Sequence, residues 1–210
     1  KVTDKSTGED NPIENQKAVL QNLLETAKDT SFGKAYAFED ILESNNPQQA
    51  FRNAVPYFDY NQINDAWWHK LHEGQTDVTW PGSPDYFALS SGTTGKTSKR
   101  IPVTDAMIDA IRQAGIKQVL AISNFDLPAD FFETGILMLG SSTDLVENDD
   151  HLEGEISGIS ASNIPSWFSG YYKPGKEIAQ IDDWDERVAK IAEKAADWDI
   201  GALSGIPSWI

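Results

Sequence analysis

The sequence predicts an α/β fold, in which a helical N-terminal segment leads into a β-sheet layered with helices. Before residue 80, apolar residues recur at helical spacing. After residue 84, a short apolar run passes directly into a loop rich in glycine and hydroxyl residues, and a further amphipathic helix follows that loop. The order strand, loop, helix is typical of an α/β layer.

The first helix is expected to begin at Asn11 and Pro12, because asparagine caps helices and proline suits the first helical position. It should run to about Lys28. Its apolar residues repeat every three to four positions and predict one buried stripe of Val19, Leu20, Leu23, Leu24 and Ala27.

A second amphipathic helix is predicted after Asp59, which forms a potential capping box with Gln62. Ile63, Trp67 and Leu71 then fall four residues apart, and Gly74 ends the pattern. The prolines and glycine of residues 81–84 mark the change from helical to strand patterning.

Beyond that change, residues 86–89 predict a strand, and residues 101–103 predict an extended segment before a helix capped by Thr104. We expect this helix to bury Ile108, Ile111, Val119 and Ile122. A second strand is predicted at residues 135–139, and it leads into a loop of the small residues Gly140, Ser141, Ser142 and Thr143. This loop could approach a substrate or could be an ordinary turn. A last helix is predicted from Trp184, Val188, Ile191, Ala195 and Trp198.

Composition narrows the class of protein. The 210 residues include 33 acidic and 17 basic side chains, and the formal net charge of -16 makes nucleic acid an unfavourable partner. There is no cysteine, so a disulfide framework and a thiolate metal site are excluded. No apolar run approaches the roughly 18 residues of a membrane span, and we expect a cytoplasmic protein without a membrane partner.

The segment whose composition indicates a chemical function is residues 90–99, which combine hydroxyl side chains with two glycines and two lysines. Phosphate oxygens need convergent N–H and O–H donors with positive charge, and glycine lets backbone amides turn inward. The composition suits a polyphosphate, although flexible exposed loops share it. A Walker loop is disfavoured, because Ser90 stands where that pattern needs glycine and an extended segment follows instead of a helix.

The same loop resembles the first signature of the acyl-adenylating superfamily. Its stretch from Gly95 to Lys99 is longer than the commonest form and has no proline before the lysine, which points away from acyl-CoA synthetases and luciferases. The loop resembles instead that of the Gretchen Hagen family of acyl acid amido synthetases, also called the auxin-responsive promoter family, including its bacterial members. The resemblance continues in order along nearly the whole chain, through Thr30-Ser31-Phe32-Gly33-Lys34, Val55-Pro56-Tyr57, Trp80-Pro81-Gly82, Ile101-Pro102-Val103, Gly154-Glu155-Ile156-Ser157-Gly158 and Ser204-Gly205-Ile206-Pro207-Ser208-Trp209.

This resemblance implies an enzyme that uses ATP and Mg²⁺ to activate a carboxylic acid as an acyl-adenylate and then ligates it to an amine such as an amino acid. The phosphates would be bound by Ser90, Ser91, Gly92, Thr93, Thr94, Gly95 and Lys99, with Lys96 as an extra cation. Residues 1–210 would form an incomplete N-terminal domain, mainly helical over 1–80 and α/β over 81–210, without the C-terminal domain and inactive alone. A thioester-forming acyl-CoA synthetase and a non-catalytic binding module are the alternatives.

Other candidate sites have simpler interpretations. His69 and His72 have a spacing that can bind metal, but no third ligand is apparent, and we expect surface or packing roles. His151 follows the acidic residues 147–150, which lack the spacing of a calcium loop and are expected to be solvated surface. The tryptophans on helical stripes are expected to pack in the core: Trp67, Trp184 and Trp198.

Overall fold

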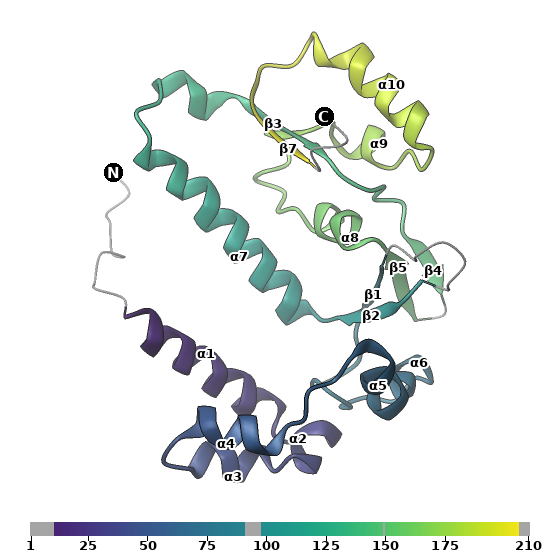
Figure 1. The fold of residues 1–210 in the computed structure, drawn as a ribbon. Helices are drawn as coiled ribbons and strands as arrows, with labels where there is room; N and C mark the ends of the chain where they lie inside the picture. Colours follow the sequence, from purple (N-terminus) through teal and green to yellow (C-terminus); the bar gives the residue numbers. More distant parts are fainter. Residues whose placement is uncertain (1–10, 91–97, 149, 206–210) are drawn as a thin grey trace. The chain divides into compact units, whose positions relative to one another are not determined.

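A computed structural model describes residues 11–90, 98–148 and 150–205 of the chain (Figure 1). The chain divides into two compact units, Lys1–Ser83 and Pro84–Ile210, and each is described by itself. The described part of the first unit is helical, and the second unit combines helices with two sheets.

The first unit begins with four helices, of which α1 is the longest. They are α1 (Pro12–Ala27), α2 (Ser31–Ala35), α3 (Phe38–Glu43) and α4 (Pro47–Ala54). The Asn11 side chain accepts a hydrogen bond from the Ile13 N–H at 3.1 Å, which confirms the predicted start of α1. The helix ends one residue before the predicted Lys28.

Fewer apolar residues of α1 are buried in the core of this unit than the sequence predicted. Leu24 and Ala27 are buried with Phe38 and Ile41 of α3, and Leu20 packs against them. Val19 and Leu23 are exposed, so the prediction that they are buried was wrong. Leu20, Leu24 and Ala27 share one face at spacings of four and three residues, and the exposed residues lie on either side of that face.

A tight corner joins α1 to α2. Thr30 is buried; its hydroxyl donates to the Ala27 carbonyl at 2.7 Å and accepts from the Gly33 N–H at 3.0 Å. A Cβ at Gly33 would lie 2.1 Å from the same Ala27 carbonyl oxygen, so only glycine fits there. The corner therefore depends on two residues of the predicted motif Thr30-Ser31-Phe32-Gly33-Lys34.

The second predicted helix is present as two short α-helices joined by a π-helical segment. The capping box of Asp59 and Gln62 is present as predicted at the start of α5 (Tyr60–Ile63). The chain then passes through the π-helical segment η1 (Asn64–Trp68) and into α6 (His69–His72). Trp67 in η1 packs its ring 5.2 Å from that of Phe32, so its predicted packing role is confirmed.

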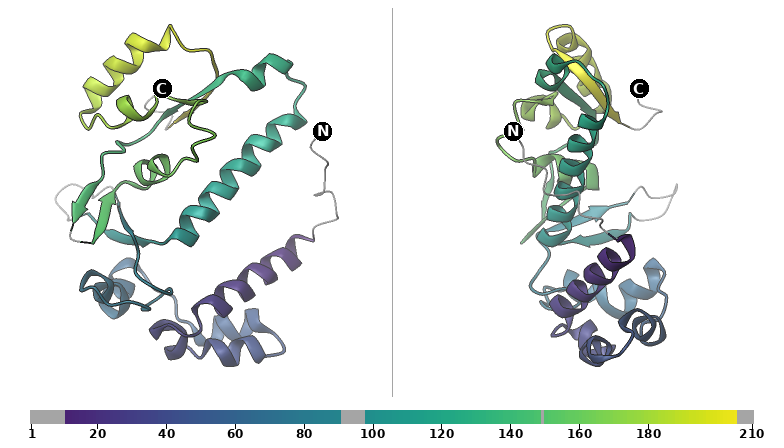
Figure 2. Two further views of the ribbon diagram at one scale, coloured as in Figure 1. Left: turned by 180° about the vertical axis from the view of Figure 1, so that it is seen from behind. Right: turned by 90° about the vertical axis from the view of Figure 1, so that its left-hand side faces the viewer.

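The second unit contains a four-stranded sheet in the order β2-β1-β5-β4. Its strands are β1 (Tyr86–Leu89), β2 (Arg100–Val103), β4 (Val146–Asn148) and β5 (His151–Gly154). β1 pairs with β2 antiparallel and with β5 parallel. One face packs against α7 (Asp105–Ala121) and α8 (Ile156–Ser162), with Ala88, Val103, Ile108 and Ile159 buried between them (Figure 2).

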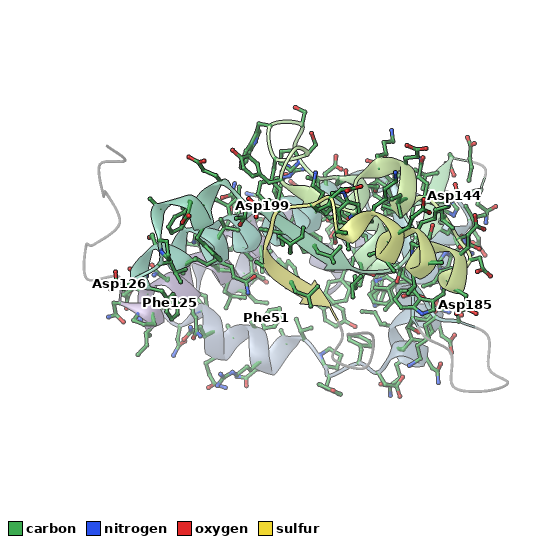
Figure 3. The ribbon with its side chains drawn as sticks, turned by 90° about the horizontal axis from the view of Figure 1, so that it is seen from above. Phe51, Phe125, Asp126, Asp144, Asp185 and Asp199 are labelled. Carbon is green, nitrogen blue, oxygen red and sulfur yellow. The ribbon has the colours of Figure 1, made fainter. Side chains whose placement is uncertain are left out.

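A three-stranded parallel sheet, in the order β6-β3-β7, lies further along the chain. It consists of β3 (Gly135–Leu139), β6 (Tyr172–Lys173) and β7 (Ile200–Gly205). The helices α9 (Lys176–Ala179) and α10 (Trp184–Ala195) lie beside it (Figure 1). Between α7 and β3 the chain forms two 3₁₀ turns, η2 (Ile122–Asn124) and η3 (Ala129–Glu133), with Phe125 exposed between them (Figure 3).

The predicted α/β fold is confirmed, with corrections to individual side chains. Val119 on α7 and Val188 on α10 are exposed, contrary to prediction, because only one side of each helix meets a sheet or another helix. Trp198 is partly buried but lies beyond the end of α10 at Ala195. Over the residues described, helices fall short of the length and apolar character needed to cross a membrane.

Candidate functional site

The candidate phosphate-binding loop joins the two strands of a β-hairpin. The Ser90 N–H donates to the Lys99 carbonyl at 3.0 Å, which continues the β1–β2 pairing by one residue pair. Ser90 is half-buried and Lys99 is exposed. These two predicted site residues therefore face each other at the loop end of the hairpin, and we call this pair the hairpin mouth.

The other predicted contacts of the loop lie outside the described residues. They are Ser91, Gly92, Thr93, Thr94 and Gly95, together with the additional cation Lys96. Their predicted role therefore remains a hypothesis that rests on composition and on the hairpin mouth.

Strand geometry indicates which side of the sheet the hairpin mouth faces. Side chains alternate along a strand, so Ser90 lies on the same face as Ala88, and Lys99 on the same face as Ile101. That face packs against α8. Because β1 and β5 are parallel, the residues that follow β5, beginning with Glu155, lie at the same sheet edge as Ser90.

The small-residue loop after β3 contacts this edge. Ser157 at the start of α8 donates its hydroxyl to Ser141 Oγ at 2.9 Å, and the Ser141 N–H donates to Ser157 Oγ at 3.2 Å. Ser141 also donates its hydroxyl to Glu155. The loop is therefore more than an ordinary turn, because its hydrogen bonds link the carboxyl end of β3 to the segment that follows β5.

Close packing reinforces this junction. A Cβ at Gly158 would lie 2.1 Å from the Ser142 carbonyl oxygen, so α8 can approach the loop only with glycine at that position. Gly158 closes the motif Gly154-Glu155-Ile156-Ser157-Gly158, and its backbone role explains why the motif ends in glycine. The carboxyl ends of β1, β5 and β3 are thus connected through α8 and its preceding turn.

On the opposite face of the same sheet lies a polar cluster of Arg100, Asn148, His151 and Glu153, in which Glu153 is buried, Arg100 and His151 are partly buried and Asn148 is exposed. Arg100 donates to Glu153, and its Nη2 lies 2.9 Å from His151 Nε2. His151 Nε2 lies 2.9 Å from Glu153 Oε1, and Asn148 donates to the same oxygen at 3.1 Å. Phe87 on β1 contacts residues of both neighbouring strands: its ring centre lies 4.7 Å from that of His151 on β5 and 5.2 Å from the guanidinium carbon of Arg100 on β2.

The cluster favours the ionised form of Glu153. Burial acts to raise the pKa of this carboxyl, but hydrogen bonds from His151, Arg100 and Asn148 outweigh burial and hold the pKa below its usual value. Arg100 begins β2 directly after Lys99, so the charged cluster ties the strand that leaves the hairpin mouth to β5 and β4.

Sequence reasoning did not identify this cluster. Glu147 and Asp150 are exposed, as predicted for the acidic segment, but the His151 side chain is only 11% exposed. The available signal was the spacing of His151 and Glu153, which places both on one face of a strand. The segment was interpreted as surface because β4 and β5 were not predicted.

The histidine pair on the first unit has packing contacts, as expected. His69 Nδ1 lies 3.0 Å from the Asn64 carbonyl oxygen, and His72 is half-buried. Within the described ranges, groups of three or more His, Asp or Glu side chains arranged to hold a metal ion do not occur.

Comparison with known proteins gives the family. Residues 7–191 match the GH3 family N-terminal domain. Among solved structures, one described as "GH3.15 acyl acid amido synthetase" has a TM-score of 0.69 at 15% identity over 92% of this chain. A second, described as "AtGH3.15 acyl acid amido synthetase in complex with 2,4-DB", has a TM-score of 0.63 at 17% identity over 91% of this chain.

The chain spans 33% of the length of each of these two structures, and at this identity the structural likeness concerns the fold. A search of curated proteins found no match. The match to the family domain covers most of the sequence and agrees with the ordered motifs. The chain therefore belongs to the GH3 family and carries its N-terminal domain.

Proposed function

We propose that this chain is part of an ATP-dependent ligase that activates a small carboxylic acid as an acyl-adenylate and transfers the acyl group to an amine such as an amino acid. The observation that carries the proposal is the hairpin mouth, where Ser90 and Lys99 stand together at the carboxyl edge of the parallel pair β1 and β5. Open α/β sheets bind ligands at this edge. The family and the name of the solved relatives support the same class of reaction.

In this proposal the loop binds the β- and γ-phosphates. The Ser90 hydroxyl would donate to a phosphate oxygen, and the Lys99 ammonium would add a charge-assisted hydrogen bond. Residues 91–95 would supply further hydroxyl and amide donors. When the carboxylate attacks the α-phosphorus, negative charge builds on the departing pyrophosphate, and donors already aimed there stabilise it without reorganising.

Magnesium fits this proposal as an ion held largely by the nucleotide. In the described ranges, no group of three or more acidic or histidine side chains is arranged as a metal cage. Mg²⁺ commonly keeps several waters and binds through phosphates with only one or two carboxylates. Its chemistry there would be to neutralise phosphate charge, and the chain's own contribution would be the loop donors.

The test is acid-dependent exchange of labelled pyrophosphate into ATP, measured on the full-length protein with a panel of small carboxylic acids. We expect exchange with at least one acid, followed by amide formation when amino acids are added. Turnover with coenzyme A and none with amines would replace the amide assignment by thioester formation. Absence of exchange with every acid, in protein that is folded by circular dichroism, would reject ligase function.

A further inference from the structure

The strand that leaves the hairpin mouth, β2, lies at the edge of the four-stranded sheet (Figure 1). Among the described residues it pairs with β1 and with no other strand, over four residue pairs. Pro102 has no N–H, which is typical of an edge strand that takes no further partner. The position of β2, and of Lys99 just before it, therefore depends on a short ladder and on the contacts of its side chains.

Arg100 is the residue of β2 that directly follows Lys99. Hydrogen bonds alternate along an antiparallel pair, so the bond from the Ser90 N–H to the Lys99 carbonyl places Arg100, opposite Leu89, between two hydrogen-bonded pairs. Side chains also alternate, so Arg100 and Lys99 lie on opposite faces of the sheet. Arg100 can therefore fix the backbone of Lys99 without occupying the face on which Lys99 lies.

The Arg100 side chain reaches across β1 to the strand beyond it. Its guanidinium donates to Glu153 on β5, and its Nη2 lies 2.9 Å from His151 Nε2 on the same strand. Phe87 of the intervening strand β1 is only 1% exposed, and its ring centre lies 5.2 Å from the guanidinium carbon. The Arg100–Glu153 bond thus joins the edge strand to an inner strand of the sheet.

The carboxylate that receives this bond is itself held in place. Asn148 of β4 donates to Glu153 Oε1 at 3.1 Å, and His151 Nε2 lies 2.9 Å from the same oxygen. Glu153 is 9% exposed, and β5 pairs with β1 on one side and with β4 on the other. Glu153 therefore offers Arg100 a fixed anchor, and loss of the guanidinium would leave β2 with its short ladder to β1.

We propose that Arg100 is a positioning residue of the hairpin mouth: its bond to Glu153 fixes β2 against the sheet and thereby holds Lys99 where it reaches the terminal phosphates of ATP. The inference rests on the proposed function, which supplies the nucleotide. If loss of the bond leaves Lys99 in that place for only a fraction of the time, the apparent affinity for ATP falls by that fraction.

Hydrogen–deuterium exchange at the Ser90 N–H, which is bonded to the Lys99 carbonyl, measures directly how β2 is held. We compare single amides in the full-length protein, in Arg100→Met and in the control Arg52→Met, which removes an exposed arginine of α4. The reference amide is the Leu152 N–H, bonded at 2.9 Å on the β5 side of β1. We expect Arg100→Met to speed exchange at Ser90 about tenfold or more, because a hydrogen bond to a charged group contributes on that scale. Exchange at Leu152, and both amides in Arg52→Met, should keep their rates.

Two outcomes of this comparison would overturn the proposal. An unchanged rate at Ser90 would show that Arg100 does not hold β2. An equal rise at Ser90 and Leu152 would show a general loss of stability instead of a specific role. If Arg100→Met does not fold, Arg100→Gln, which keeps a shorter polar side chain, is judged by the same two amides.

Nucleotide binding tests whether Arg100 acts through Lys99. We expect Arg100→Met to weaken binding of ATP with Mg²⁺ about three- to tenfold and to change AMP binding little, because only ATP carries the β- and γ-phosphates. In Lys99→Met protein the same substitution should change ATP affinity by less than about twofold, since the group that Arg100 positions is gone. Effects that simply add would show that Arg100 acts on ATP by another route and would refute the positioning role.

Failure of the proposed function would look different. Absence of acid-dependent pyrophosphate exchange in the unsubstituted protein would reject the ligase, whereas exchange at Ser90 and the comparison of ATP with AMP would still judge Arg100. If Lys99→Met alone leaves ATP binding unchanged, the hairpin mouth is not the phosphate site, and the positioning role of Arg100 is refuted with it.

Discussion

Replacing Glu153 by glutamine tests whether the polar cluster around this buried carboxylate holds the four-stranded sheet together. Glu153 is a central strand residue whose side chain is 11% exposed and which accepts hydrogen bonds from residues of β2 and β4. Glutamine keeps the size of the side chain and removes its negative charge. The variant therefore leaves Arg100 beside a neutral acceptor.

The expected loss can be bounded from the contacts. Hydrogen bonds to charged groups contribute about 1.5–3 kcal/mol, and removing one partner of a buried ion pair costs about 3–5 kcal/mol. The Arg100 side chain is 32% exposed and can recover part of its hydration, and glutamine still accepts one hydrogen bond. We therefore expect Glu153→Gln to lower the free energy of unfolding by about 2 kcal/mol.

The assay is urea unfolding at pH 7, followed by tryptophan fluorescence and by circular dichroism. Glu147→Gln is the matched control, because Glu147 lies on the neighbouring strand β4 and is exposed. It should change the unfolding free energy by less than about 0.5 kcal/mol. Equal effects of the two substitutions would show that the cluster contributes no more than a surface charge and would refute the reasoning.

The pH dependence provides a sign test of the same cluster. The pKa of Glu153 in the folded state lies below its usual 4.5, so its stabilising contribution is present above pH 4.5 and is lost as the pH falls through the folded value. Unfolding free energies measured between pH 7 and pH 3 should fall more steeply for the unsubstituted protein than for Glu153→Gln. Parallel curves would contradict the assignment.

Three further predictions concern other parts of the chain. Gly158→Ala should destabilise the second unit by about 1–3 kcal/mol in urea unfolding, because a Cβ at this position would collide with the Ser142 backbone carbonyl. Gly115→Ala on α7 is the control: a Cβ there would meet no other atom, so this substitution should stabilise the protein by about 0.5–1 kcal/mol. Thr30→Val should cost about 1–3 kcal/mol by the same measurement, because it removes the hydroxyl's bond to the Ala27 carbonyl and leaves the buried Gly33 N–H without its capping acceptor. Burial and the negative charge of Asp105 raise the pKa of Asp85, so Asp85→Asn should raise the melting temperature at pH 7 and have less effect near pH 3, where the carboxyl is protonated.

Local patterns predicted the elements that local physics determines. The Asn11 cap, the capping box at Asp59 and the Thr104 cap are all present, because each depends on residues two or three positions apart. The strand at residues 86–89 and the strand at 135–139 were also predicted, since each is a short apolar run beside a turn signal.

Non-local pairing explains most of what the sequence did not reveal. The strands β4 and β5 are short and polar, and they become strands because β5 pairs with β1. Without that pairing, His151 and Glu153 look like part of a solvated acidic segment. The side chains Val19 and Val119 were assigned to buried stripes because a stripe shows which residues share a face but not how wide the contact will be.

The strands that flank the candidate loop were predicted, whereas the loop's phosphate-binding role stays a prediction. Sequence placed residues 90–99 after a buried strand, and Ser90 and Lys99 do face each other across the hairpin. The contribution of the loop after β3, through Ser141 and Ser157, depends on a contact across 16 positions and had no local signal. Gly158 was noticed only as part of a family motif, and its physical reason is a contact with the Ser142 carbonyl.

The central claim is that the hairpin mouth binds the terminal phosphates of a nucleotide. It is tested most directly by comparing the binding of ATP and AMP to the full-length protein and to Lys99→Met, with Lys117→Met on α7 as the control. We predict that Lys99→Met weakens ATP binding about tenfold or more and AMP binding little, because only ATP carries the β- and γ-phosphates. Equal effects on both nucleotides, or no effect on ATP, would contradict the account.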